Sequence, residues 1–507
     1  MDPAAEQSEP AASGAAMSPR KRWVFRVVAV LLGPLLLLLV EGAFTLFDVG
    51  RPDLYDDPFA GFSDVQPLFV LSDDDAEYEI PKARQAFFEP ESFPAKKSPR
   101  EFRIFVLGGS TVAGRPYGAK TSFTAWLELS LNAVDASRDW NVVNCGGVSY
   151  ASYRLIPILA ELEHHEPDLY VICTGQNEFL EDRTYASIKQ QPRWLAWTEQ
   201  RLSRLRSVTV LRSGWQSIGN DGLGPDKPAL PSEVDARLDW ARGMEAYDRD
   251  PAWQADVVAH YESNLRRMAA IAQEQGAPLI FVSPVSNLDW APFKVEHRDD
   301  LTDAERTQFD ALWDEATTWY ERDPERSLEL LEQAIAIDGQ HAGVLFAAGQ
   351  TCQSLNRLER ARELLTSAKD QDVCPLRMLE SMQDVFQRVA EETSTPLVDA
   401  NARFAERSQG GMVGDEWLVD HVHPTLEGHQ LIAQWLLEEL VRQEFAALKA
   451  DWRPAIESAY QEHLEGIEEI YFVKGQYRNE TVQRWARGQA TRERGEASEA
   501  EGVSRSE

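Results

Sequence analysis

Short apolar runs alternate with amphipathic stretches from about residue 100 onward. The runs 102–108 (FRIFVLG), 140–145 (WNVVNC) and 168–175 (DLYVICTG) are rich in apolar residues and are bounded by glycine or polar residues, which is typical of buried parallel strands. Between them, 122–134 and 151–162 carry apolar residues at helical spacing. The alternation predicts an α/β fold in which helices cover both faces of a parallel sheet.

Two further strands are expected at 278–285 and 395–400, and the last clear helix at 428–441. Active residues of doubly wound sheets lie beyond the carboxyl ends of the strands. Polar residues follow the predicted strands at these ends, and they are Ser110, Asn144 to Ser149, Gln176, Asn177, Ser286 and Asn287. The pattern predicts a three-layer, doubly wound sheet with a site at this edge, where Asn144, Ser286 and Asn287 are candidate substrate contacts.

Two long stretches interrupt this alternation. The first, 180–260, contains many Trp and Arg residues and a turn-rich loop at 217–231. The second, 301–390, is almost entirely helical in pattern. Both are expected to shape a substrate cleft beside the sheet.

The helical stretch contains an internal repeat with a period of 34 residues, which is typical of tetratricopeptide helix pairs. Small or apolar residues recur in both copies, as Ser327, Leu331 and Ala334 and then as Ala361, Leu365 and Ala368. The first copy is degenerate, since Glu315 stands where the second has Gly349. A generic helical hairpin is the alternative to a tetratricopeptide-like insertion.

The N-terminus carries a different pattern. Residues 1–22 are predicted to be a disordered cytoplasmic segment, and 23–47 a transmembrane signal anchor, because four basic residues between 20 and 26 flank an apolar run. A cleaved signal peptide is the alternative, but 41–44 (EGAF) is a poor cleavage site. Residues 48–100 are expected to be an irregular juxtamembrane linker. The domain would then be extracytoplasmic, either periplasmic or on the cell surface.

Composition excludes one class of partner. The net charge is −32, and a phosphate backbone requires a basic face, so nucleic acid is not an expected partner. The four cysteines have no metal-type spacing and are too few for a disulfide scaffold, although Cys352 and Cys374 could form a bridge. At the C-terminus, 446–485 is expected to be a helical extension and the charged residues 486–507 a disordered tail.

The candidate nucleophile is Ser110 in FVLGGSTVAG. Gly108 and Gly109 permit a sharp turn after the strand and leave the hydroxyl accessible, while the following helix directs backbone N–H groups at the same space. The motif is neither GxSxG, since Val112 occupies the last position, nor a nucleotide P-loop. An anion-binding turn is the alternative for this motif taken alone.

The candidate base is in DHVHPTLEGH near the C-terminus. Asp420 and His423 are three residues apart before the last helix, a spacing at which the carboxylate can accept a hydrogen bond from one imidazole nitrogen. The other nitrogen can then take a proton from a serine. A metal site is the alternative, because His421 and His429 lie nearby, but no matching ligand cluster follows the other strands. Asn177, just past the third strand, could donate its amide to an oxyanion.

Together these motifs resemble the SGNH/GDSL hydrolase superfamily, and most closely its members with an N-terminal anchor and a tetratricopeptide insertion. Ser110 in GGST matches the first block, Asn177 in GQNEF the third, and Asp420 and His423 the DxxH of the last. The resemblance implies a flavodoxin-like three-layer sheet, with a discontinuous hydrolase domain over 101–300 and 391–445. It also implies an esterase that requires no cofactor or metal.

The second block departs from this pattern. The superfamily uses a glycine N–H as an oxyanion donor, and the matching position in NCGGVSY is Ser149, with Gly147 as the alternative in a shifted loop. The expected oxyanion hole is therefore the N–H of Ser110, the N–H of Gly147 or Ser149, and the side chain of Asn177. The expected substrate is an ester-bearing lipid or glycan of the cell envelope.

Two other functions stay open on the sequence. The same site could transfer an acyl group to a glycan hydroxyl as an O-acyltransferase. Alternatively, the domain could be catalytically silent, with the helical insertion binding a protein partner. The presence of Ser110, Asn177, Asp420 and His423 together favours an enzyme, because a decayed site usually loses one of them.

Overall fold

The structure is a computed structural model, and it describes residues 19–47, 49, 54, 57, 60–62, 64–181, 206–208, 210, 229–239, 243–448 and 451–483. The chain divides into two compact units, Met1–Asp53 with Ala186–Lys227 and Leu54–Tyr185 with Pro228–Glu507. The first unit contains helix α1 (Pro19–Leu46), where Glu41 accepts hydrogen bonds from the backbone N–H groups of Arg206 and Ser207. The sheet and the candidate site lie in the second unit.

A five-stranded parallel sheet organises the second unit, with the spatial order β10-β9-β7-β5-β6. Counted along the chain this is the order 2-1-3-4-5 of flavodoxin-like sheets. The strands are β5 (Glu101–Gly108), β6 (Asp139–Gly146), β7 (Leu169–Cys173), β9 (Leu279–Val282) and β10 (Leu397–Val398). Each predicted strand is present. The strand order reverses beside β5, the strand that leads to Ser110.

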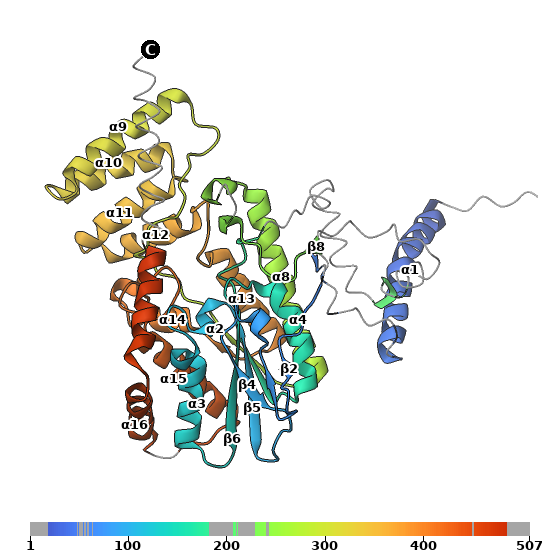
Figure 1. The fold of residues 1–507 in the computed structure, drawn as a ribbon. Coiled ribbons are helices and arrows are strands. Elements are labelled where there is room, and N and C mark those ends of the chain that lie inside the picture. The colour runs from blue at the N-terminus through green and yellow to red at the C-terminus, as the bar shows by residue number, and fades with distance from the viewer. Residues whose placement is uncertain are drawn as a thin grey trace, which may run out of the picture. The chain divides into compact units, whose positions relative to one another are not determined.

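Helices cover both faces of this sheet, as Figure 1 shows. On one face lie α3 (Phe123–Val134), α15 (Leu426–Arg442) and α16 (Trp452–Glu465). On the other lie α4 (Ser152–Leu162), α8 (Pro251–Gln275) and α13 (Glu380–Thr393). This is the predicted three-layer arrangement, and it explains why the strand sequences are apolar on both faces.

Side-chain caps define where several of these helices begin. Ser122 accepts from Thr124 N ahead of α3, Asp250 accepts from Trp253 N ahead of α8, and Thr425 accepts from Gly428 N ahead of α15. Each cap satisfies a backbone donor that the helix itself leaves without a partner. The Thr425 cap fixes α15 directly after the loop that carries Asp420 and His423.

The helical insertion consists of two helix pairs: α9 (Asp303–Trp319) with α10 (Pro324–Ile337), and α11 (Ala342–Ser354) with α12 (Leu358–Asp370). The repeated small and apolar residues noted in the sequence are all buried between these helices. The predicted boundary at 390 is too late, because α13 packs against α8 of the sheet domain.

The segment expected to be an irregular linker is partly regular. It contains β1 (Gly61–Phe62), which pairs with β8 (Ala229–Leu230), and an antiparallel sheet of β2 (Val70–Leu71), β3 (Glu77–Glu79) and β4 (Ser92–Pro94). Phe69 and Phe93 bury their rings against Phe105 of β5, which holds the segment on the sheet domain. The sequence did not predict these strands because all the pairings are short, and β1 pairs with a strand far away in the chain.

Some expectations concern residues that the structure does not describe. They include residues 1–18, most of the loop 217–231, and the tail 486–507. The expected transmembrane segment coincides with α1, where many side chains also lie outside the described part. Among the helices described, none is both long enough and apolar enough to span a membrane. The four cysteines are buried and free, so Cys352 and Cys374 form no bridge.

A glycine at the helix contact gives a test of the insertion's packing. A Cβ added at Gly349 of α11 would lie 2.7 Å from the Cγ of Leu365 in α12. We expect Gly349→Ala to lower the free energy of unfolding by about 1–2 kcal/mol, since overpacking outweighs the gain in helix propensity. Gly339→Ala is the control, because its Cβ would meet only the Ile335 carbonyl at 3.4 Å. Equal stability of both variants in urea unfolding would contradict the packing.

Candidate active site

Ser110 begins the short helix α2 (Ser110–Ala113), directly after β5 and two glycines. A Cβ at Gly108 would lie 2.2 Å from the Cys173 carbonyl, and one at Gly109 would lie 2.5 Å from Nδ2 of Asn177. Both positions therefore require glycine for close approach to the neighbouring strand and its loop. The turn places Ser110 at the carboxyl end of the sheet, with 9% of its surface exposed.

A continuous chain of hydrogen bonds links Ser110 to the loop before α15. The Ser110 Oγ lies 2.7 Å from Nε2 of His423, and the His423 Nδ1 lies 2.6 Å from Oδ2 of Asp420. Of the residues that the sequence singles out, these three are brought together as expected. A hydroxyl, an imidazole and a carboxylate in this order can move a proton from the hydroxyl to the imidazole.

The Asp420 carboxylate is held in its charged form. Burial acts to raise its pKa, but the charges of His423 and His421 and the hydrogen bonds from His423 and from the Val422 N–H hold that pKa well below its ordinary value. The other oxygen, Oδ1, accepts from the backbone N–H of Val422 and of His423 at 2.9 and 2.8 Å. Both oxygens are thereby oriented, which fixes the imidazole for its role.

Asn287 supports this loop rather than contacting a substrate. Its side chain is fully buried and donates to the Asp420 carbonyl at 2.9 Å and to Oδ1 of Asp415 at 2.8 Å. Its backbone N–H donates to the His421 carbonyl at 3.0 Å, and its own carbonyl accepts from Arg377 at 2.9 Å. The prediction of substrate contact is wrong for Asn287. No sequence pattern indicated the role of Arg377, which lies in the irregular stretch after α12.

The prediction of substrate contact is also wrong for Asn144. It is buried, and its amide donates to the Val112 carbonyl at 2.7 Å and to the hydroxyls of Ser122 and Thr124, while Oδ1 accepts from the Gly146 N–H. It ties the helix after Ser110 to β6 and to the start of α3, so all its polar atoms are used within the fold.

Ser286 is also buried, and it does not join the Ser110 group. Its Oγ has no hydrogen-bond partner among the described residues. It lines a separate cavity of about 440 Å³ between α12 and the sheet domain. The structure therefore does not place Ser286 in contact with the reacting atoms.

Asn177 lies beside the nucleophile, as expected. Its Nδ2 donates to the Tyr150 carbonyl at 2.9 Å and approaches the backbone at Gly109 closely. An amide nitrogen has two N–H donors, and the second makes no hydrogen bond to a described residue. Asn177 is partly exposed, in contrast to its buried neighbours Gln176 and Glu178.

The loop after β6 distinguishes between Gly147 and Ser149. The Gly147 N–H donates to the Gly108 carbonyl at 2.9 Å and is therefore occupied. The Ser149 N–H makes no hydrogen bond to a described residue, and Ser149 has φ of +65°, a left-handed conformation that glycine adopts most readily. The backbone at Ser149 thus has the conformation that explains a glycine at the matching position.

Two further histidines near the site do not join the hydrogen-bonded chain. His421 packs its ring against Phe293, and burial lowers its pKa to about 4. His429 accepts from the Phe123 N–H at 3.2 Å, and burial lowers its pKa to about 3. Within the described residues no group of three or more His, Cys, Asp or Glu side chains could hold a metal ion.

One protein family matches part of the chain. Residues 319–374 match the tetratricopeptide repeat family. This span covers α10, α11 and α12, so the predicted tetratricopeptide-like insertion is confirmed. No curated protein matches the chain.

Several solved structures are similar to the chain. An α/β hydrolase from the metagenome of Lake Arreo is 16% identical and covers 66% of this chain and 94% of its own, with a TM-score of 0.28. A lipase/acylhydrolase from Enterococcus faecalis is 14% identical, with 69% and 98% covered and a TM-score of 0.29. A GDSL-like lipase from Bacteroides thetaiotaomicron is 11% identical, with 69% and 92% covered and a TM-score of 0.29.

The burial of His429 predicts a pH dependence of stability. Between about pH 3 and its ordinary pKa of 6.5, His429 is neutral when folded but protonated when unfolded, so it lowers the free energy of unfolding as pH falls. This group can lower the free energy of unfolding by up to about 1.4 kcal/mol for each pH unit of acidification. We expect His429→Gln, which keeps an acceptor for the Phe123 N–H, to abolish that contribution. Urea unfolding between pH 4 and 6.5 measures it.

The comparison with wild type isolates His429. Burial raises the pKa of Glu91 to about 7 and that of Asp372 to about 6, so both titrate in the same range with the opposite effect on stability. Both are unchanged in the variant. Identical pH slopes for the two proteins would show that His429 does not titrate on unfolding.

Proposed function

We propose that this protein is a serine hydrolase that cleaves carboxylic esters through an acyl-enzyme intermediate. The observation that carries the proposal is the hydrogen-bonded chain from Asp420 through His423 to Ser110. Ser110 is the nucleophile, His423 the general base and Asp420 the group that orients the imidazole and stabilises its charged form. These roles also agree with the resemblance to SGNH hydrolases.

In the first step His423 Nε2 takes the Ser110 hydroxyl proton while Oγ forms a bond to the ester carbonyl carbon. The carbonyl oxygen becomes an oxyanion, and the imidazolium next to Asp420 carries the proton. Collapse of this tetrahedral intermediate breaks the bond to the leaving alkoxide, which receives the proton from His423. Ser110 is then acylated, and a water molecule repeats the sequence to release the acid.

The oxyanion is stabilised by three donors near Ser110. These are the Ser110 N–H at the start of α2, the Ser149 N–H, and the second N–H of the Asn177 amide. Gly147 is excluded from this set because its N–H is already bonded to Gly108. Loss of one such donor typically reduces kcat by about 10²–10³-fold.

The catalytically silent scaffold is less favoured than an enzyme. A silent domain has no need to keep a buried carboxylate, an oriented imidazole and a partly accessible hydroxyl in one hydrogen-bonded chain. Transfer of the acyl group to a sugar hydroxyl would use the same steps with a different acceptor, and no described residue favours that acceptor over water.

We also propose that the enzyme is anchored to a membrane with its catalytic domain outside the cytoplasm. The support is the basic flank and the apolar run of the sequence, and the exposed leucines of α1 from Leu35 to Leu39. An ester-bearing lipid or glycan of the cell envelope is the substrate class that this location offers.

The nucleophile can be tested by substitution. We expect Ser110→Ala to lower the turnover of a p-nitrophenyl acyl ester by at least about 10³-fold, because the residual oxyanion site cannot replace the nucleophile. Ser137→Ala, at an exposed serine after α3, is the control and should keep wild-type turnover. Wild-type turnover in Ser110→Ala would contradict the assignment.

The location has its own test. In a fractionation without detergent, we expect the full-length chain to sediment with membranes and to be released by detergent but not by high salt, because an apolar anchor does not depend on charge. Recovery of the intact chain in the soluble fraction would contradict the anchor and leave the hydrolase assignment untouched.

A further inference from the structure

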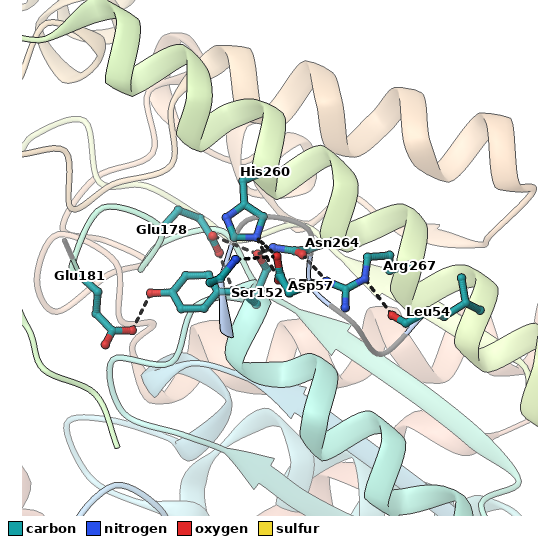
Figure 2. A network of polar contacts seen from close by, with 10 residues as sticks. Leu54, Asp57, Ser152, Glu178, Glu181, His260, Asn264 and Arg267 are labelled. Atoms are coloured by element: carbon teal, nitrogen blue, oxygen red, sulfur yellow. Dashed lines mark hydrogen bonds and ion pairs between the residues drawn. The ribbon is translucent and has the colours of Figure 1, made fainter. Parts of the chain in front are cut away.

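A buried polar network lies between α4 and α8 (Figure 2). Its central members are all less than a tenth exposed, and they are Asp57, Ser152, Glu178, His260, Asn264 and Arg267. Three of them, His260, Asn264 and Arg267, lie at helical spacing on one face of α8. A buried polar group without a partner costs free energy, so the hydrogen bonds among these side chains hold together the elements that carry them. Among the described residues, only Nη2 of Arg267 in this group has no hydrogen-bond partner.

One end of the network holds Leu54 and Asp57, at the start of the second unit. The Asp57 carboxylate lies 3.0 Å from His260 Nε2 and 3.0 Å from Arg267 Nη1. Arg267 Nε also donates to the Leu54 carbonyl at 2.8 Å. Asp57 is thus clamped between two side chains of α8, far from Ser110 in sequence.

The other end holds the loop that carries Asn177. Arg267 donates to Oδ1 of Asn264 at 3.1 Å, and Asn264 donates to the Ser152 Oγ at 3.0 Å. Ser152 in turn donates through both its hydroxyl and its backbone N–H to the Glu178 carboxylate, at 2.9 and 2.7 Å. Glu178 follows Asn177 directly in the chain.

Two contacts therefore bind the loop of Asn177 to the loop of Ser149. The Asn177 amide donates to the Tyr150 carbonyl, and Glu178 accepts from Ser152 two residues further on. The oxyanion donors of the proposed mechanism lie on these two loops, at Asn177 and Ser149. Their separation is set by the same residues that lead back to Asp57.

We propose that Asp57, Ser152 and Glu178 are positioning residues for the oxyanion hole, and that the hold on Asp57 sets the rate at Ser110. This inference rests on the proposed hydrolase function. A release of Asp57 leaves the charge of Arg267 without its carboxylate, so Arg267 and Asn264 shift and the brace on Ser152 loosens. A displacement of an oxyanion donor by a fraction of an ångström lowers kcat but leaves ground-state binding, and hence KM, nearly unchanged.

A matched control is a carboxylate of α4 that holds the same N-terminal segment as the Asp57 contacts do. Glu161 of α4 accepts from the backbone N–H groups of Leu68 and Phe69 at 2.6 and 2.8 Å, so it also holds the N-terminal segment on the domain. It makes no contact with the network around Ser152. Glu161→Gln therefore loosens the segment while it leaves the contacts of Asp57, Ser152 and Glu178 in place. The segment also reaches the Tyr150 hydroxyl through Arg84, by a path that does not include Asp57.

The test measures ester turnover of the full-length protein for Asp57→Asn, Ser152→Ala and Glu161→Gln. We expect Asp57→Asn and Ser152→Ala to lower kcat by about tenfold or more with KM within about twofold, and Glu161→Gln to keep kcat within about twofold. Thermal melting verifies that each variant is folded, and Ser152→Ala decides the question if Asp57→Asn does not fold.

A double-substitution cycle shows whether Asp57 acts through the oxyanion hole. In an Asn177→Ala background, whose kcat is already reduced by about 10²–10³-fold, Asp57→Asn should cause a smaller further loss than it causes in the wild type, because one of the two donors that the network positions is already absent. Unchanged kcat in Asp57→Asn and Ser152→Ala, an equal loss in Glu161→Gln, or fully additive losses in the cycle would overturn the inference. Wild-type turnover that survives Ser110→Ala would instead overturn the proposed function, and the inference with it.

Discussion

The hydrogen bond between Ser110 and His423 is the contact on which the proposed chemistry of this protein depends. It joins residues 313 positions apart, so it exists only because the fold brings the end of β5 and the loop before α15 to the same edge of the sheet. Parallel strands place all their carboxyl ends at one edge, and the helices on both faces hold that edge rigid. The imidazole is fixed from behind by Asp420, and that loop is fixed by Asn287.

Much of this arrangement could be predicted from the sequence. The apolar runs indicated β5, β6 and β7 because strands buried on both faces lack alternation. The Gly108–Gly109–Ser110 turn and the spacing of Asp420 and His423 indicated chemistry because few structural needs produce them together. The period of 34 residues indicated the helix pairs, whose close contact at Gly349 and Leu365 the structure shows.

Other features lay beyond a single sequence. Asn144 and Asn287 follow strands as substrate contacts would, but the direction of their side chains depends on tertiary packing, and both are consumed by internal hydrogen bonds. The choice between Gly147 and Ser149 required the backbone angle at Ser149 and the bond from Gly147 to Gly108. The Asp57 network joins four separate parts of the chain, so no local sequence pattern predicts it. In the proposed mechanism, this network links the segment before the sheet to the two loops that carry Asn177 and Ser149.

The most direct test of Ser110 as the nucleophile is to identify the residue that a fluorophosphonate modifies. The protein should be treated briefly with a fluorophosphonate, digested and mapped by mass spectrometry. If His423 activates Ser110, a single adduct should lie on the peptide that contains Ser110, and His423→Ala should abolish it. An adduct on a different serine, or ester turnover by a protein that forms no adduct at Ser110, would contradict the account.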